Sequence, residues 1–323
     1  MDSIPSILNQ FKNKQVLIIG DAMIDAYMWG EIHRMSPEAP VPVVNIEKHE
    51  NRLGGAANVA LNIQSLGATP LLFSAIGTDH YGDVFCMLMK KQKLSCEGLQ
   101  RLSDRNTTVK TRIISDNKHV LRVDEESTKP ITEHFVATEL EKLIRSKKFD
   151  VLIFEDYNKG LLTENLITKA IQIAKELKIP TIVDPKKDNF FAYQGVDVFK
   201  PNLKEIKEGL GVEFDVLSEA ELSKNVSSVL EKLNAKGILL TLSKHGIYFQ
   251  NKSQIFREAA HKRNIVDVSG AGDTVVSVTA LALACGLESE QLMRIANLAG
   301  GLVCEKVGVV PILIEDLINS CEN

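Results

Sequence analysis

Aromatic residues and cysteine are scarce in this sequence. Its 323 residues include one tryptophan, five cysteines and only 6% aromatic residues. The cysteines form no CxxC pair and no close cluster with histidine, which argues against a zinc site and a disulfide framework. No apolar run is long enough to cross a bilayer, and the N-terminus lacks the basic and apolar regions of a signal peptide. We therefore expect a cytoplasmic protein with reduced thiols.

Several common catalytic motifs are also missing. The sequence contains no GxxxxGK[ST], no strand-linked GxGxxG, no HExxH and no GxSxG, so a P-loop, a standard dinucleotide site, a zincin site and a nucleophile elbow have no support. A basic excess is absent as well, because the net charge is −4. This balance argues against a general nucleic-acid or membrane-surface binder. Small molecules are therefore the expected partners.

The chain does contain a regular alternation of strand-like and helix-like segments. Such an alternation predicts an α/β fold, with a mainly parallel sheet covered by helices on both faces. No linker or internal repeat divides the chain, so residues 1–323 are expected to form a single domain. The expected strands are 16–20, 71–77, 150–154, 180–184, 196–199 and 237–242, with a hairpin across 246–257; the expected helices are 59–66, 81–91, 133–146, 162–177, 202–209, 218–233 and 274–285.

Two β-like segments interrupt this alternation. Residues 31–50 contain Pro37, Pro40 and Pro42, which preclude a helix and fit an extended edge. Residues 107–124 carry a second β pattern. We expect the two segments to pair into a small β-sheet lid that excludes water from the site. Its exposed edges predict pairing between two chains, and hence a homodimer.

The segment 267–273 combines an anion site with a carboxylate. Gly270, Ala271 and Gly272 precede an apolar helix, and the free N–H groups and dipole of a helix N-terminus favour negative charge. Asp273 stands beside them in the first turn. An anion site next to an aspartate suggests proton abstraction during transfer of a charged group. Taken alone, an ordinary turn before a helix explains the segment equally well.

Other polar residues follow the expected strands. Asp25 comes after the first strand, and Gly54, Gly55 and Asn58 stand at the start of a helix. Because the carboxyl ends of parallel strands meet at one edge of a sheet, these residues favour a shared site there, although each alone fits a solvated turn. Four further loops belong to the same set: 155–160, 184–187, 201–205 and 241–246.

The motifs resemble those of a known family. Segment 267–273 resembles the signature of the ribokinase-like (PfkB) carbohydrate kinases, and Gly54–Asn58 resembles their sugar-binding signature. The resemblance extends from Val16 to about Pro311, and segments 34–42, 54–60, 156–160 and 184–186 resemble the heptose 7-phosphate kinase subgroup. It implies a ribokinase-like fold and ATP-dependent phosphorylation of the C1 hydroxyl of heptose 7-phosphate, for ADP-heptose and lipopolysaccharide core synthesis.

The resemblance also implies roles for single residues. Asp273 would be the base, and the amides of Gly270, Ala271 and Gly272 would stabilise the transferring phosphoryl group. Other residues would hold the sugar (Asp25, Gly54, Gly55, Asn58 and Asp156), Mg²⁺ through water (Asn202 and Glu205), ATP (Thr241, Ser243, Gly246 and Asn297) and a monovalent cation such as K⁺ (Asp267 and Ser269).

A sugar phosphate also needs a cationic cradle. The candidates are Lys110 and Arg112 on the expected lid, with Lys159 and Lys186 on strand-end loops. For Lys110, a solvated surface position is an equally good interpretation.

Alternative functions remain at this point. Another sugar kinase of the family, such as a fructokinase, ribokinase or phosphofructokinase type, fits the same motifs. A sugar-phosphate sensor without catalysis fits less well because Asp273 and its glycines are intact, and a helix-bundle interaction protein conflicts with the alternation. Bifunctional relatives carry a second, nucleotidyltransferase domain with an HxGH-type motif. Residues 1–323 contain no such domain, so we expect that step on a separate chain.

Overall fold

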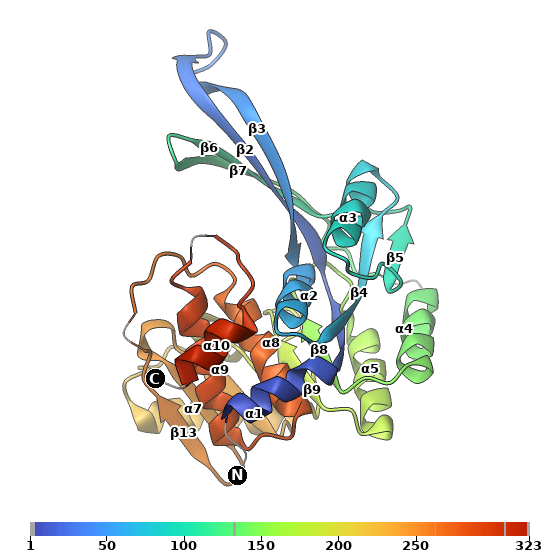
Figure 1. Ribbon diagram of the computed structural model, residues 1–323, viewed down its shortest axis with the longest axis vertical. Coiled ribbons are helices and arrows are strands. Elements are labelled where there is room, and N and C mark those ends of the chain that lie inside the picture. Colours follow the sequence, from blue (N-terminus) through green and yellow to red (C-terminus); the bar gives the residue numbers. More distant parts are fainter. Residues whose placement is uncertain (1–3, 132–133, 262, 307, 322–323) are drawn as a thin grey trace.

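The computed structural model describes residues 4–131, 134–261, 263–306 and 308–321 (Figure 1). Its centre is a nine-stranded sheet in the order β13-β12-β11-β10-β9-β8-β1-β4-β5, in which all neighbours are parallel except β11–β12 and β12–β13. This arrangement confirms the predicted α/β class. The strands are β1 (Gln15–Gly20), β4 (Thr69–Gly77), β5 (Leu99–Leu102), β8 (Val151–Glu155), β9 (Thr181–Asp184), β10 (Val198–Phe199), β11 (Gly237–Thr241), β12 (Ile247–Asn251) and β13 (Ile255–Glu258).

Helices bury both faces of this sheet. In β1, Val16 and Ile18 join one apolar core, while Leu17 and Ile19 join the other, which explains why the strand is apolar throughout. Residues of α1 (Ile4–Asn9), α2 (Ala56–Ser65), α3 (His80–Lys91), α8 (Ala271–Ala284), α9 (Ser289–Val303) and α10 (Ile314–Cys321) belong to the first core; those of α4 (His134–Ser146), α5 (Glu164–Leu177), α6 (Leu203–Leu210) and α7 (Glu219–Leu233) belong to the second.

A second, four-stranded sheet projects from the body (Figure 1). Its order is β3-β2-β6-β7, formed by β2 (Ala22–Met35), β3 (Pro42–Gly55), β6 (Val109–Ser115) and β7 (Lys118–Glu125). We call it the small sheet. It begins at Ala22 rather than near residue 31, because β2 and β3 pair along almost their full length. Asp25 therefore lies within a strand and not in a loop. Pro42 is the first residue of its strand, where no ladder hydrogen bond is lost.

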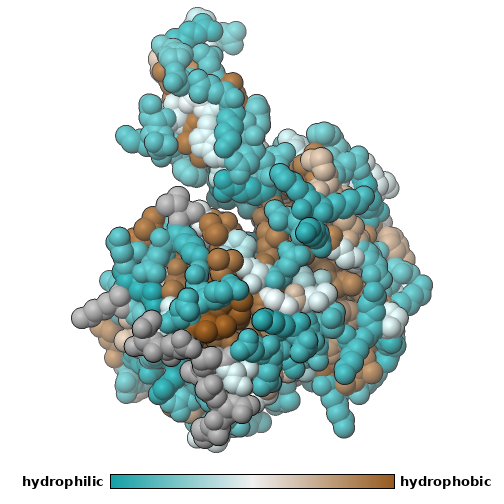
Figure 2. Space-filling model, in the orientation of Figure 1, coloured by the Kyte–Doolittle hydropathy of each residue, from teal (hydrophilic) through white to brown (hydrophobic). Residues whose placement is uncertain are grey.

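The two faces of the small sheet differ in chemistry. On one face the register aligns Asp25 with Lys110 and Tyr27 with Arg112. The opposite face carries Met28, Ile113, Leu121 and Val123. Leu121 is 55% exposed and Val123 is 43% exposed, and Figure 2 shows hydrophobic residues, in brown, within this part of the molecule. One face is thus charged and the other apolar.

The sequence misplaced some elements. Strand β5 and helices α9 and α10 carried no prediction, and α2 begins at Ala56 rather than Val59 because Gly55, with a φ of 58°, already turns the chain into the helix. The predicted start of a helix at residue 133 lies outside the described residues. None of the described helices combines the length and apolar character needed to span a membrane.

Candidate active site

The first turn of α8 is built on Gly270. This residue has a φ of 79°, in the left-handed region that favours glycine. An added Cβ would come within 3.0 Å of Val309 Cγ1 and 3.5 Å of Asn58 Nδ2. The turn begins α8, and helix geometry leaves the first N–H groups of the helix without intrahelical acceptors. One is partly engaged, since the Ala271 N–H donates to the Val268 carbonyl at 3.3 Å.

Asp273 is a buried carboxylate held by two side chains. It is 9% exposed. The Asn58 amide donates to Oδ2, and the Tyr157 hydroxyl donates to Oδ1 at 3.1 Å. Burial raises the pKa of Asp273 to about 6, against the opposing effect of the Asn58 hydrogen bond. A carboxylate with such a pKa is ionised at neutral pH yet basic enough to accept a proton from a hydroxyl.

More buried charges surround this carboxylate. Asp184, at the end of β9, forms an ion pair of 2.8 Å with the fully buried Lys200. A Cβ on Gly272 would lie 3.6 Å from Asp184 Oδ2, so the first turn of α8 packs directly over this pair. Glu155, at the end of β8, is buried with no partner for Oε2. Burial and the neighbouring Asp184 and Asp273 raise the pKa of Glu155 well above its usual range.

The predicted sugar-binding residues are linked to Asp273 through Asn58. Asp25 forms an ion pair of 2.6 Å with Arg112. A Cβ on Gly54 would collide with the Asp25 carboxylate, and one on Gly55 would lie 2.5 Å from the Asp21 carbonyl. Glycine is therefore required at both positions for the chain to pass directly from the end of β3 into α2. This entry places Asn58 in hydrogen-bond contact with Asp273.

A cavity of about 860 Å³ lies beside the first turn of α8. Its volume is within the range of small-molecule sites. Apolar side chains of Ile265, Val268 and Val275 contribute to its wall. The cavity brings together most of the residues predicted to bind the nucleotide, and it also includes residues that the sequence did not single out, Arg263 and His261 among them. The predicted residues that line it are Asn202, Thr241, Ser243, Gly246, Asn297, Ala271 and Gly272.

Glu205 does not line this cavity. Asn202 and Glu205 form a capping box at the start of α6, in which each side chain accepts the other residue's N–H at 2.9 Å. Glu205 also pairs with Lys186. Among the described residues, no group of three or more His, Cys, Asp or Glu is placed to hold a metal ion. The side chains of Asn202 and Glu205 offer oxygen donors, and this pair fits Mg²⁺ held through water because Mg²⁺ prefers oxygen and usually keeps several waters.

All four predicted phosphate-binding cations form ion pairs with carboxylates. Arg112 pairs with Asp25, and Lys186 with Glu205. Burial lowers the pKa of Lys186, but the negative charges of Asp184 and Glu205 outweigh this and raise it. The remaining pairs are Lys110 with Asp124 at 3.1 Å and Glu126 at 2.9 Å, and Lys159 with Glu126 at 2.9 Å.

Asp156 is occupied by protein donors. Its carboxylate accepts from the Asn158 N–H at 2.8 Å, the Asn189 amide at 3.0 Å and the Tyr193 hydroxyl at 2.7 Å. These contacts assign Asp156 to holding the loop after β8. A contact between Asp156 and substrate stays a prediction, and this geometry does not favour it.

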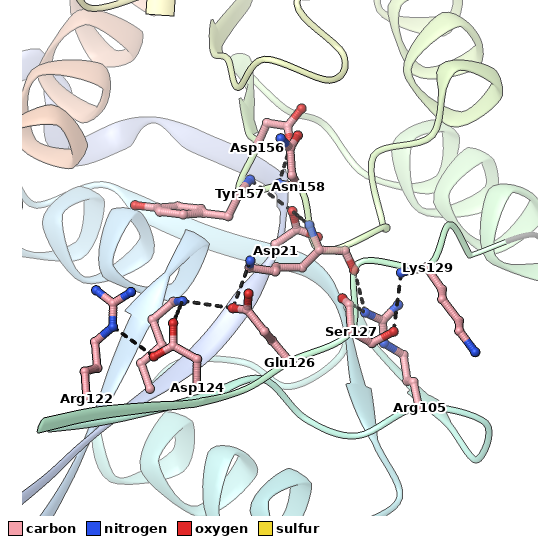
Figure 3. A network of polar contacts seen from close by, with 12 residues as sticks. Asp21, Arg105, Arg122, Asp124, Glu126, Ser127, Lys129, Asp156, Tyr157 and Asn158 are labelled. Carbon is pink, nitrogen blue, oxygen red and sulfur yellow. Dashed lines mark hydrogen bonds and ion pairs between the residues drawn. The ribbon is translucent and has the colours of Figure 1, made fainter. Parts of the chain in front are cut away.

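Asp21 organises the same loop. Its buried carboxylate accepts the N–H group of Tyr157 at 3.0 Å (Figure 3). It also accepts the N–H groups of Lys159 at 3.0 Å and Leu161 at 3.3 Å. Burial raises the pKa of Asp21 to about 6. The turn that Asp21 supports is more than 130 residues away in the chain. Sequence reasoning missed Lys200 as a site residue because no local pattern marks it, and it included Tyr157 only as part of the loop 155–160, with no role of its own.

Comparison with known proteins places the chain in a family. The profile of the pfkB family carbohydrate kinases matches residues 13–315. The chain belongs to this family. It is therefore an ATP-dependent carbohydrate kinase.

Among its relatives, the bifunctional protein HldE of Syntrophotalea carbinolica is 35% identical over 98% of this chain and 64% of that protein. The HldE of Pseudomonas aeruginosa strain LESB58 is 38% identical over 95% of this chain and 64% of that protein. The chain thus spans 64% of the length of these two relatives.

Solved structures of other family kinases share the fold. The structure of phosphofructokinase-2 from Escherichia coli in complex with potassium has a TM-score of 0.78 and 16% identity, over 96% of this chain and 100% of that chain. Arabidopsis thaliana ribokinase complexed with ribose and ATP has a TM-score of 0.74 and 16% identity, over 96% of this chain and 99% of that chain. At such identities the likeness establishes the ribokinase-like fold alone.

Proposed function

We propose that this kinase transfers a phosphoryl group from ATP to the C1 hydroxyl of D-glycero-D-manno-heptose 7-phosphate. The product would be the 1,7-bisphosphate, a precursor of ADP-heptose and the lipopolysaccharide core. The buried Asp273 carboxylate, held between Asn58 and Tyr157 beside the first turn of α8, carries the assignment to phosphoryl transfer. Similarity to the HldE proteins and the segments 34–42 and 156–160 favour the heptose.

Each residue near Asp273 has a proposed task. Asp273 would take the proton from the attacking hydroxyl, and Asp25, Gly54, Gly55 and Asn58 would orient the sugar. Amides of the first turn of α8, at Gly270, Ala271 and Gly272, would stabilise charge on the phosphoryl group in transit. The small sheet would act as a lid that keeps water from this group.

The nucleotide would occupy the cavity of about 860 Å³. Thr241, Ser243, Gly246 and Asn297 would contact it, with its phosphates toward Gly272. Mg²⁺, when bound, would neutralise charge on the phosphates. Asn202 and Glu205 would hold its waters.

A monovalent cation near Asp267 and Ser269 is part of the proposal. It rests on the potassium complex of phosphofructokinase-2. In this chain Asp267 accepts the N–H groups of Ser269 at 2.9 Å and Gly308 at 3.0 Å, which orders the loop around the position. Replacing KCl by choline chloride at constant ionic strength should lower kcat. An unchanged kcat would reject the cation.

A homodimer through the small sheet is also proposed. Leu121 and Val123 expose an apolar face on a sheet that projects from the body, and β3 and β7 form the two edges of this sheet. Both features support contact with a second molecule. A second copy offers the same surfaces. Sedimentation should give a dimer for the native chain and a monomer for a Leu121→Asp, Val123→Asp variant. A native monomer would contradict the proposal.

ADP release from a panel of sugars and sugar phosphates tests the main assignment. Heptose 7-phosphate should give the highest kcat/KM, and phosphate should appear on its C1 oxygen. A preference for ribose, fructose or fructose 6-phosphate would identify another kinase of the family. Tight sugar-phosphate binding without ADP release would identify a sensor. Because ATP and nucleotide sugars are cytoplasmic metabolites, we expect the reaction in the cytoplasm.

A further inference from the structure

One carboxylate joins two lysines from separate parts of the molecule. Lys110 lies in β6 of the small sheet, and Lys159 lies in the loop after β8 of the main sheet. Both side-chain nitrogens lie 2.9 Å from the same oxygen of Glu126, the residue that follows β7. Figure 3 shows Asp124 and Glu126 below Asp21, with their ion pairs as dashed lines. The side chains of Lys110 and Lys159 are only 15% and 13% exposed, so both ammonium groups lie largely out of solvent.

The cluster borders the candidate sugar site. Lys110 is aligned with Asp25 across the β2–β6 pair, and Asp25 adjoins Gly54. Lys159 lies two residues after Tyr157, whose hydroxyl contacts Asp273. Each lysine therefore lies on a segment that carries, or pairs with, a residue of the candidate sugar site.

The charges of the cluster leave room for one more negative charge. Its cations are Lys110, Lys159 and Arg122, the last paired with Asp124 at 2.9 Å. Its anions are two carboxylates, Asp124 and Glu126. Lys110 and Lys159 are largely desolvated and require nearby compensation, whereas the Arg122 side chain is 59% exposed. If a phosphate dianion took the place of the Glu126 carboxylate, three positive charges would face three negative ones.

Among the carboxylates that pair with the four predicted phosphate-binding cations, Glu126 is the one most easily displaced. Arg112 and its partner Asp25 are both held within strands of the small sheet, where the Arg112 guanidinium lies 5.3 Å from the Tyr27 ring centroid. The partner of Lys186, Glu205, is fixed in the capping box of α6. Glu126, by contrast, begins a segment, 126–131, that is neither helix nor strand. Its side chain can leave the lysines without disturbing an element.

We propose that Lys110 and Lys159 form the subsite for the phosphate of the sugar substrate, and that Glu126 is an internal anion that the phosphate displaces. This rests on the proposed function. A dianion competes with one carboxylate for two ammonium groups, whereas a hydroxyl does not. Glu126 thereby compensates the lysines and selects for phosphorylated sugars.

Kinetics of Glu126→Gln test the exchange. The variant removes the competing charge, so KM for the phosphorylated sugar should fall roughly three- to tenfold at unchanged kcat, about 0.7–1.4 kcal/mol in binding. KM for the unphosphorylated sugar should not change.

Lys159→Met should raise KM for the phosphorylated sugar at least ~10-fold. The matched control is Glu125→Gln, at an exposed neighbouring acid, and it should behave like the native chain. Equal changes in KM for both sugars in Glu126→Gln would overturn the proposal.

Inorganic phosphate separates this subsite from the proposed function. In thermal unfolding of the full chain, phosphate should raise Tm more than chloride at equal ionic strength. The midpoint should fall to lower phosphate concentration in Glu126→Gln, and the effect should vanish in Lys110→Met, Lys159→Met. The same phosphate response in all three proteins would refute the subsite. If the responses differ as expected but no sugar phosphate supports ADP release, the subsite stands and the proposed function fails.

Discussion

The pKa values of carboxylates are shifted in opposite directions at the two sheets of this molecule. At the edge of the main sheet, burial raises the pKa values of Asp21 and Asp273 to about 6. In the small sheet, partial burial of Glu126 is outweighed by hydrogen bonds from Lys159 and Lys110, which lower its pKa. The pKa of Asp124 is lowered in the same way by Lys110.

The difference in pKa follows from the charged partners that each sheet places beside its carboxylates. The ends of parallel strands crowd carboxylates together beneath α8, with Lys200 as a fully buried cation. In the small sheet, acids and bases alternate across neighbouring strands and compensate one another locally. Uncompensated carboxylates are costly but basic, which suits proton transfer. Paired charges are stable and exchangeable, which suits binding of a charged group.

The largest effect is expected when the buried carboxylates at the edge of the main sheet lose their cation, Lys200. Lys200→Met leaves Asp184 as an unpaired buried charge, so we expect a loss of about 3–5 kcal/mol in the free energy of unfolding, as for other broken buried pairs. Urea unfolding measures it. The double variant Lys200→Met, Asp184→Leu should recover most of this loss. If the single variant were as stable as the native chain, the pair would not compensate the cluster.

Removal of the proposed base comes next. Asp273→Asn should lower kcat at least ~10²-fold, the lower range for a positioned acid or base, with a small change in the KM for ATP. Steady-state ADP release measures it, and Asp116→Asn, at an exposed turn, is the matched control. Near-normal turnover in Asp273→Asn would remove Asp273 from the mechanism.

The pH dependence of kcat should reflect the raised pKa of Asp273. Because the ionised form is the base, kcat should rise with pH and level off above about 6. The Tyr157 hydrogen bond lowers this pKa, so Tyr157→Phe should move the acid limb to higher pH. Comparing the two proteins on the same substrate cancels the ionisation of the sugar phosphate. A limb that stays in place would show that another group controls it.

The smallest effect is expected at the outer small sheet. Lys48 pairs with Glu50 at 3.0 Å and is largely exposed, and such pairs contribute about 0–1 kcal/mol. Lys48→Met should therefore change the free energy of unfolding by no more than about 1 kcal/mol, and less in high salt. A loss as large as that of Lys200→Met would erase the distinction between the two sheets.

Much of the site could be anticipated from local sequence. Gly54, Gly55 and Gly270 are recognisable as glycines in short motifs. The structure explains them, because each occupies a position where a Cβ would collide or where φ is positive. Alternating strands and helices predicted the parallel sheet, and hence a common edge for its loops. By contrast, Lys200 and Tyr157 carry no such sign, since their roles depend on partners 16 and 116 residues away.

The sequence by itself determined the α/β class, the glycine turns and the candidate base, because periodicity and backbone constraints act over a few residues. Only the tertiary structure decided which charges meet. It assigned Asp156 to the loop after β8, buried Lys200 under α8 and brought Lys110 to the same carboxylate as Lys159. Electrostatic energies depend on distance and desolvation, and both are set by how distant segments pack.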